Sequence, residues 1–156
     1  MAEAPTHAEL SAINERMVGQ FLAQAEQPLL EGHYAVRVLE CRGRATGQPR
    51  RTPLGLTQVD GNHYLVSPVL DRDWVRNLAA EPRCALIHQD GPHPRIAVPV
   101  RGDEAVTAIA TYLSTMRVPW AVRAFPVAPD ASAEQIAAHV DTMAVFRLDD
   151  PDGDAR

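Results

Sequence analysis

The segment that decides the fold is residues 34–67, which begin Tyr34-Ala35-Val36-Arg37-Val38-Leu39 and carry the turn Asp60-Gly61-Asn62 near their end. In these six residues Tyr34, Val36 and Val38 alternate with Ala35, Arg37 and Leu39, a pattern typical of a half-buried strand. Residues 52–59 predict a second strand and residues 63–67 a third. Because a short turn centred on Gly favours a hairpin, we expect these strands to pair antiparallel.

Three further strands are predicted in the rest of the chain. Residues 83–89 and 95–101 form a pair joined by the turn Asp90-Gly91-Pro92-His93-Pro94, and residues 142–148 form the last strand. Helices do not alternate regularly with the strands, which argues against a doubly wound parallel sheet. We therefore expect an α+β fold, in which an antiparallel β-barrel of about six strands carries its helices outside.

The helices are predicted from apolar spacing and capping residues. An N-terminal helix begins with the capping box Thr6-His7-Ala8-Glu9, runs to about Ala25 and ends before Pro28. Its apolar residues recur at spacings of three and four and are expected to pack on the core: Leu10, Ile13, Met17 and Phe21. Two or three peripheral helices follow: one capped by Asp71 or Asp73, one over residues 103–116 ended by Pro119, and one from Asp130 or Ser132 to about Val140, with a capping box of Ser132 and Gln135.

Length and composition bound the class of protein. A chain of 156 residues, 46% of them hydrophobic, fits one domain. We place this domain at residues 1–148, with the N-terminal helix in residues 1–28 and a disordered acidic tail at residues 149–156. No apolar run reaches the roughly 18 residues of a membrane helix, and no secretory signal is recognised, so we expect a cytoplasmic protein. A net charge of −5 argues against nucleic-acid binding.

Several kinds of site are disfavoured by the residues present. All 15 basic residues are Arg, which suggests a GC-rich genome of the actinobacterial kind and excludes Schiff-base chemistry through Lys. Cys41 and Cys84 are predicted to be buried thiols rather than a disulfide or a reactive pair. His88 and His93 have no third ligand nearby, so no metal site is predicted. Neither a G-x-G-x-x-G segment nor a Walker loop occurs.

The first candidate site is the loop Gly43-Arg44-Ala45-Thr46-Gly47-Gln48-Pro49-Arg50, here called the arginine loop. Arg42 and Arg51 flank it, so four guanidinium groups fall close together in the sequence. A turn with glycines exposes backbone N–H groups, and Arg adds forked donors, a combination that suits an anion. A solvated basic turn is the alternative interpretation.

The second candidate site comprises Ser67-Pro68-Val69 and the following Trp74-Val75-Arg76-Asn77-Leu78. A strand ends at the first of these segments, and the second predicts a short helix with Trp74 and Asn77 one turn apart. A flat indole beside an amide suits a planar heterocycle with polar edges. Alternatively, Trp74 is an anchor of the core.

These two candidates, in this order, resemble the deazaflavin (F420)-dependent nitroreductase and quinone reductase family, small split-barrel proteins related to flavin reductases. The family pattern is G-R-(K/R)-(S/T)-G-x-x-R, a strand opening with Pro-Leu, a hairpin, W-x-x-N-L and a proline. This chain has the arginine loop, Pro53-Leu54, Asp60-Gly61-Asn62, Trp74-Val75-Arg76-Asn77-Leu78 and Pro82. Ala45 replaces the second basic residue of the pattern, and Arg42 or Arg51 is the candidate to supply its contact.

The resemblance implies an F420 site, with FMN or no cofactor as the alternatives. The phosphate and polyglutamate tail of F420 would meet Arg44, Thr46, Gly47, Gln48 and Arg50. The ring would lie against Ser67, Pro68, Val69, Trp74 and Asn77. The implied reaction is hydride transfer from reduced F420 to a hydrophobic planar acceptor, such as a quinone, a nitro compound or an activated alkene.

On the substrate side, the resemblance points to Tyr112 and Trp120, and it assigns no catalytic acid or base. It also implies a homodimer, because split-barrel relatives often pair. A second function is kept open at this point. The barrel would hold a lipid or a polyketide-like ligand without a cofactor, or act as a cyclase or isomerase.

Overall fold

The computed structural model describes residues 7–24 and 26–151 of the chain. Within them lie six β-strands: β1 (Tyr34–Arg42), β2 (Pro49–Val59), β3 (Asn62–Ser67), β4 (Arg83–His88), β5 (Gly91–Pro99) and β6 (Ala144–Asp149). The same residues form five α-helices and one 3-10 helix: α1 (His7–Ala23), α2 (Asp73–Ala80), α3 (Gly102–Thr115), α4 (Pro119–Arg123), α5 (Ala133–Ala137) and η1 (Val140–Thr142).

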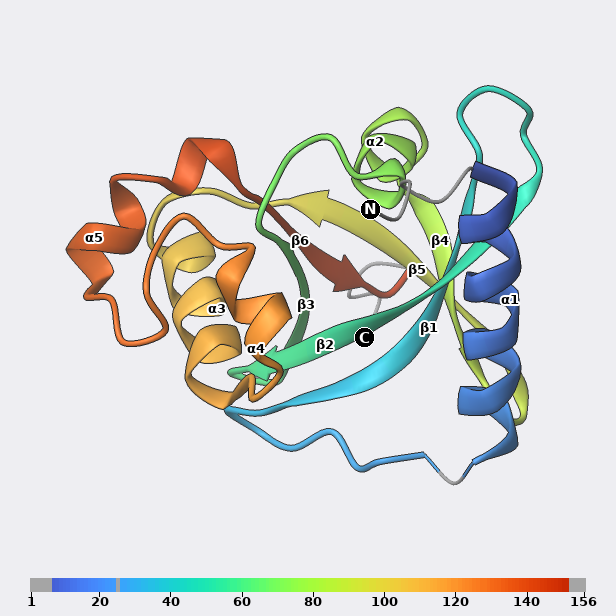
Figure 1. The fold of residues 1–156 in the computed structure, drawn as a ribbon, viewed down its shortest axis with the longest axis horizontal. Coiled ribbons are helices and arrows are strands. Elements are labelled where there is room, and N and C mark those ends of the chain that lie inside the picture. Colours follow the sequence, from blue (N-terminus) through green and yellow to red (C-terminus); the bar gives the residue numbers. More distant parts are fainter. Residues whose placement is uncertain (1–6, 25, 152–156) are drawn as a thin grey trace, which may run out of the picture.

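The six strands close into an antiparallel barrel in the order β1-β2-β3-β6-β5-β4 (Figure 1). The hairpin turn at Asp60 and Gly61 joins β2 to β3, and both residues have positive φ angles, 53° and 77°. The predicted α+β barrel of about six strands is therefore confirmed. The predicted pairing of strands 83–89 and 95–101 is also present, as β4 and β5.

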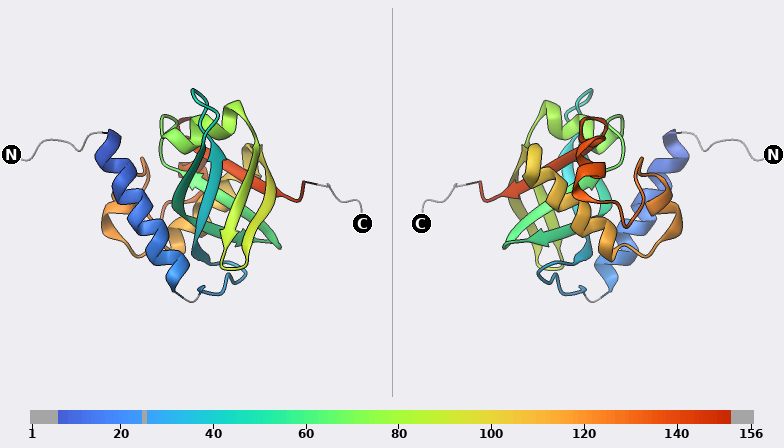
Figure 2. Two further views of the ribbon diagram at one scale, coloured as in Figure 1. Left: turned by 90° about the vertical axis from the view of Figure 1, so that its right-hand side faces the viewer. Right: turned by 90° about the vertical axis from the view of Figure 1, so that its left-hand side faces the viewer.

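The core is divided between the inside of the barrel and two outer layers. Inside, Leu39, Leu56, Leu65 and Leu86 are each no more than 2% exposed. Outside, α3 packs on β2, β3 and β6, while α1 packs on the opposite side of the barrel (Figures 1 and 2). The alternation of side chains along each strand explains this arrangement, because successive residues face the inside and the outside in turn.

The predicted packing face of α1 is wrong at Ile13 and Met17 and correct at Phe21. Ile13 and Met17 are exposed, whereas Val18 is buried against Val38 of β1 and Ile87 of β4. Phe21 completes the contact, so the packed stripe is narrower than predicted and is rotated around the helix. The stripe is narrow because α1 contacts the barrel along one face only, while its remaining faces are exposed to solvent. Thr6, Ala25 and the side chain of Leu10 lie outside the described residues.

The predicted turn at residues 90–94 is also wrong. β5 begins at Gly91, so Pro92, His93 and Pro94 belong to the strand, and His88 pairs with Gly91 across a short connection. Two prolines are tolerated there because β5 pairs with β6 only from Ile96 onward. Between Gly91 and Arg95 one edge of β5 has no neighbouring strand, so a proline there removes no hydrogen bond to β6.

Several helices and strands begin or end at residues other than those predicted. The N-cap of α2 is Arg72, with no side-chain hydrogen bond from either predicted Asp. Pro119 begins α4 rather than ending α3, which stops at Thr115. The capping box of Ser132 and Gln135 is present. Asp149 is the last residue of β6 rather than the first of a tail, and residues 152–156 of that predicted tail lie outside the described residues.

Among the helices that the structure describes, none has the length and apolar character needed to cross a membrane.

Gly55 of β2 is required by the packing of α3. A Cβ atom at this position would lie 3.1 Å from Cε1 of Tyr112 and 3.2 Å from Cδ2 of Tyr34. We expect Gly55→Ala to lower the free energy of unfolding by about 1–3 kcal/mol, because two packed rings would have to move. Chemical denaturation followed by circular dichroism measures the change.

Gly19→Ala is the matched control for that experiment. Gly19 lies in α1 and a Cβ atom there would meet nothing within 4 Å. Replacing a helical Gly by Ala is expected to leave stability unchanged or to raise it by up to about 1 kcal/mol. Equal stabilities of Gly55→Ala and the wild type would show that Tyr34 and Tyr112 do not restrict the strand.

Candidate functional site

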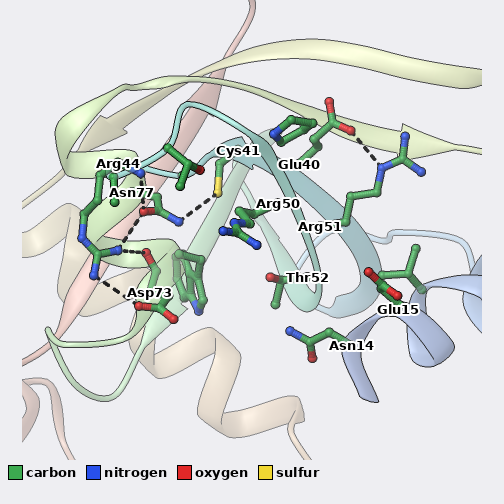
Figure 3. A pocket seen from close by; sticks show the side chains of 16 residues that line it. Asn14, Glu15, Glu40, Cys41, Arg44, Arg50, Arg51, Thr52, Asp73 and Asn77 are labelled. Carbon is green, nitrogen blue, oxygen red and sulfur yellow. Dashed lines mark hydrogen bonds and ion pairs between the residues drawn. The ribbon is translucent and has the colours of Figure 1, made fainter. Parts of the chain in front are cut away.

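A cavity of about 670 Å³ lies between the arginine loop, the first turns of α2 and the middle of α1 (Figure 3). Figures 1 and 2 show that the β1–β2 turn and α2 lie at the same end of the barrel. The cavity is lined by Asn14, Glu15, Val18, Glu40, Cys41, Gly43, Arg44, Ala45, Thr46, Pro49, Arg50, Arg51, Thr52, Asp73, Trp74 and Asn77.

The arginine loop is held by its own hydrogen bonds. The Gly43 N–H donates to the Gln48 carbonyl at 2.8 Å, and the Gly47 N–H donates to the Gly43 carbonyl at 2.7 Å. The Gln48 N–H donates to Thr46 Oγ1 at 3.2 Å, and Gly47 has a φ of 74°, which favours glycine. The backbone N–H groups expected to bind an anion are therefore largely used within the protein.

Three of the four arginines in and beside the loop have partners in the protein. Arg44 Nη1 donates to Asn77 Oδ1 at 2.8 Å, and its Nη2 lies 3.3 Å from an oxygen of Asp73. Arg51 pairs with Glu40 at 2.8 Å. Arg42 Nη1 donates to the Gly47 carbonyl at 3.0 Å and does not line the cavity. Arg42 and Arg51, the two expected substitutes for a basic residue at position 45, are thus both engaged within the protein.

Arg50 is different from its three neighbours. Its side chain lies in the cavity (Figure 3), and it forms no hydrogen bond or ion pair with any residue that the structure describes. A guanidinium group with unpaired forked donors, open to a cavity, is suited to a phosphate or carboxylate ligand. The sequence-based expectation of an anion site is therefore supported most directly at Arg50.

Trp74 and Asn77 both line the cavity, from one face of α2. Trp74 is 6% exposed and its ring lies 6.2 Å from that of Phe146, so it is also an anchor of the core. Its indole N–H is buried and has no hydrogen-bond partner among the described residues. Asn77 Oδ1, in contrast, accepts from the backbone N–H of Arg44 at 3.1 Å as well as from its guanidinium.

The structure thus brings together five of the predicted cofactor residues: Arg44, Thr46, Arg50, Trp74 and Asn77. It does not place Gly47, Gln48, Ser67, Pro68 or Val69 on the wall of this cavity. Ser67 is fully buried, and its hydroxyl donates to the Val69 carbonyl at 2.6 Å.

The two predicted substrate residues also lie away from the cavity wall. Tyr112 is buried between Tyr34 and Phe125, and burial raises the pKa of its hydroxyl to about 12. Trp120 is 72% exposed on α4. Neither side chain therefore reaches the arginine loop.

Two parts of the cavity wall were not predicted from the sequence: the contribution of α1 and the inner face of the β1–β2 hairpin. Asn14, Glu15 and Val18 close one side of the cavity, whereas the predicted helix face pointed elsewhere. The residues that the hairpin contributes can be found from the register of β1 and β2. Cys41 is paired with Arg50, so the two residues share a face of the sheet.

The charges on the cavity wall are balanced. Arg44, Arg50 and Arg51 face three carboxylates, those of Glu15, Glu40 and Asp73. In the described part of the chain, no cluster of three or more His, Cys, Asp or Glu side chains could hold a metal ion. Among the described residues the cavity therefore offers an anionic group of a ligand one unpartnered cation, Arg50.

Comparison with known proteins identifies the family. Residues 13–128 match the family model described as F420H(2)-dependent quinone reductase, which is more than half of the chain. The chain belongs to this family. It is accordingly an F420-dependent reductase, and the predicted resemblance is confirmed.

Two solved structures with TM-scores of 0.50 or more show the same fold as the reductase. A heme binding protein from Mycobacterium smegmatis matches with a TM-score of 0.51 and 18% identity, over 99% of this chain and 57% of that one. The protein Atu2129 of unknown function from Agrobacterium tumefaciens has a TM-score of 0.50 and 15% identity, over 95% of this chain and 57% of that one. An F420-H2 dependent reductase, FDR-A, has 21% identity and a TM-score of 0.47, over 79% of this chain and 99% of that one. Among curated proteins the comparison found no match.

The thiol of Cys41, on the cavity wall, and the thiol of Cys84, on β4, are expected to react slowly. Burial raises the pKa of Cys84 to about 12 and also raises the pKa of Cys41. Since the thiolate is the nucleophile, we expect iodoacetamide to alkylate the native protein at least about tenfold more slowly than the urea-unfolded protein at pH 8. Mass spectrometry of timed samples measures both rates.

The native rate should also continue to rise with pH above the range in which the unfolded protein has reached its plateau. Cys41 is buried as predicted, whereas Cys84 is only half-buried. Full alkylation of both cysteines at equal rates in the native and unfolded samples would contradict the shielding of these thiols.

Proposed function

We propose that the reductase binds F420 in the cavity beside the arginine loop and reduces a hydrophobic planar acceptor by hydride transfer. The observation that carries this proposal is Arg50, a guanidinium group on the cavity wall without a partner among the described residues. The family match supports the identity of the cofactor. The unpaired guanidinium supports a phosphate contact at Arg50.

The residues present fit this cofactor in size and in chemistry. A volume of about 670 Å³ is within the range of about 300–1,000 Å³ that small-molecule sites occupy. Trp74 offers a flat wall, and its unpartnered indole N–H is a donor that a carbonyl or phosphate oxygen would satisfy after a small adjustment. Thr46 and Thr52 add hydroxyl groups on the same wall.

Five residues of the wall have a proposed task when the cofactor is bound. Arg50 holds the phosphate through its forked donors, and Trp74 orients the ring. Asn14, Glu15 and Val18 of α1 cover the open side and limit access of water. Reduced F420 supplies a hydride when bound, and the protein provides position and environment. Contacts of Ser67, Pro68, Val69, Gly47 and Gln48 with the cofactor stay predictions, as do acceptor contacts of Tyr112 and Trp120.

The wall favours a quinone over an activated alkene. Its lining includes no Tyr or His, and the raised pKa of Cys41 makes that thiol a weak acid. Hydride addition to a quinone leaves an anion whose charge rests on oxygen, which water protonates readily. Hydride addition to an activated alkene leaves a stabilised carbanion, such as an enolate, which must take a proton on carbon to give the saturated product, and that step depends more on a positioned acid. A homodimer stays a prediction.

Replacing Arg50 tests the position of the cofactor phosphate. We expect the wild-type protein to bind F420 with micromolar affinity and Arg50→Ala to weaken binding by about 1.5–3 kcal/mol, the value of a charge-assisted hydrogen bond. Quenching of F420 fluorescence during titration measures the affinity. Arg51→Ala is the matched control, because Arg51 lines the same wall but is paired with Glu40.

The control variant is expected to bind F420 within about threefold of the wild type, since a paired surface arginine contributes little. If the wild-type protein bound neither F420 nor FMN, the proposed function would be wrong. Binding of a lipid in the absence of both cofactors would instead support the cofactor-free alternative.

Turnover with different acceptors tests the reaction. With reduced F420 as donor, we expect kcat/KM for a naphthoquinone to exceed that for a matched cyclic enone by at least about tenfold, because only the enone needs a proton delivered to carbon. Loss of reduced F420 is followed by absorbance. Equal or faster reduction of the enone would mean that the wall supplies an acid which the described residues do not include.

A further inference from the structure

We infer that Asn77 is a positioning residue, which holds the arginine loop so that Arg50 points into the cavity, and that it does not bind the cofactor ring. This inference rests on the proposed function, because the effect of Asn77 is expressed through the phosphate contact of Arg50. It assigns the asparagine of the W-x-x-N-L segment a different task from the one that the sequence indicated.

The acceptor capacity of the Asn77 amide is already in use within the protein, and one Nδ2 contact, to a sulfur, is present as well. Its Oδ1 accepts from the Arg44 backbone N–H at 3.1 Å and from Arg44 Nη1 at 2.8 Å. An amide oxygen has two lone pairs, and both are occupied by Arg44. The Nδ2 group lies 4.0 Å from Cys41 Sγ. The whole residue is only 4% exposed, so its amide presents almost no free edge to a ligand.

The loop held by Asn77 is also packed closely against Arg50. A Cβ atom on Gly43 would lie 3.2 Å from Arg50 Nε and 3.2 Å from Thr46 Oγ1, so the Gly43 backbone and these groups are close neighbours. Gly43 directly precedes Arg44, whose N–H is bound by Asn77. A displacement of Arg44 therefore displaces the backbone against which Arg50 rests.

Arg44 itself is held by two residues of α2. Its guanidinium is bound by Asn77 and Asp73 at 2.8 and 3.3 Å. A side chain that is engaged by an amide and a carboxylate has fewer donors left for a phosphate than the unpaired Arg50. Arg44 and Asn77 together thus form a clamp between the loop and α2, and they set the direction from which Arg50 enters the cavity.

The experiment compares two replacements of Asn77 and two ligands. Asn77→Leu removes the acceptor, whereas Asn77→Asp keeps an oxygen in the place of Oδ1. The ligands are F420 and the deazaflavin riboside that lacks the phosphate and the tail. We expect Asn77→Leu to weaken F420 binding by about tenfold, the equivalent of one charge-assisted hydrogen bond, and to leave riboside binding within about twofold.

The aspartate variant is the rescue. We expect Asn77→Asp to bind F420 within about threefold of the wild type, because its carboxylate accepts from the same two Arg44 donors. In the Arg50→Ala background, Asn77→Leu is expected to cause no further loss of F420 affinity, since residues that act through one contact are not additive. Fluorescence titration gives every affinity, and circular dichroism confirms that each variant is folded.

Three outcomes would overturn the inference. Equal loss of F420 and riboside binding in Asn77→Leu would place Asn77 at the ring, as would failure of Asn77→Asp to restore F420 binding. Additive losses of F420 affinity in the double variant would show that Asn77 does not act through Arg50. If Asn77→Leu does not fold, Asn77→Ala replaces it with the same expectations. Failure of the wild type to bind F420 would be a failure of the proposed function instead, and it is observed before any variant is made.

Discussion

The site depends on one constraint: β1 pairs with β2 over a longer stretch than it pairs with β4, its other neighbour in the barrel. The two strands pair from Tyr34 with Thr57 to Arg42 with Pro49, whereas β1 pairs with β4 only from Val38 to Glu40. The end of the hairpin therefore projects past the closed part of the barrel. Its inner face, with Cys41 opposite Arg50, would otherwise have packed against another strand. α2 packs on this inner face and α1 packs on the outer face of the hairpin, against Val38, and the space that they leave is the cavity.

The same projection explains why an arginine-rich turn in this chain is not simply a solvated basic loop. A hairpin end without strands on both sides needs other contacts to fix it. Here Arg44 bonds to α2, Arg42 bonds to the Gly47 carbonyl and Arg51 bonds to Glu40 of the neighbouring strand. Most of the positive charge thus stabilises the loop, and one guanidinium is left for a ligand. A count of arginines in the sequence overstates the charge that the site offers, and the absence of a basic side chain at Ala45 matters less than the sequence suggested.

The features predicted well from the sequence were local ones. The hairpin at Asp60 and Gly61, the alternation around Val38 and the Ser132–Gln135 capping box each depend on neighbouring residues. The incorrect predictions depended on long-range geometry. The apolar spacing in α1 did not reveal that Val18, rather than Met17, meets Val38 and Ile87 of two separate strands. Likewise, Pro92 and Pro94 indicated a turn because proline usually interrupts strand pairing. The sequence does not show that this part of β5 has no strand partner on one edge, where proline is tolerated. Tyr112 looked available because nothing local reveals that Tyr34, Gly55 and Phe125 enclose it.

The W-x-x-N spacing in α2 acquires a physical meaning from these contacts. A separation of three residues places Trp74 and Asn77 on one face of the helix. Trp74 fixes that face by packing on Phe146 inside the barrel, and this contact determines the direction in which the Asn77 amide points. The amide then fixes the loop through Arg44. One short helix thus links the barrel core to the loop, in addition to the hydrogen bonds between β1 and β2 at the base of the loop. A longer or shorter spacing would keep both residues but separate the core anchor from the polar clamp, so the spacing is as much a part of the site as the residues.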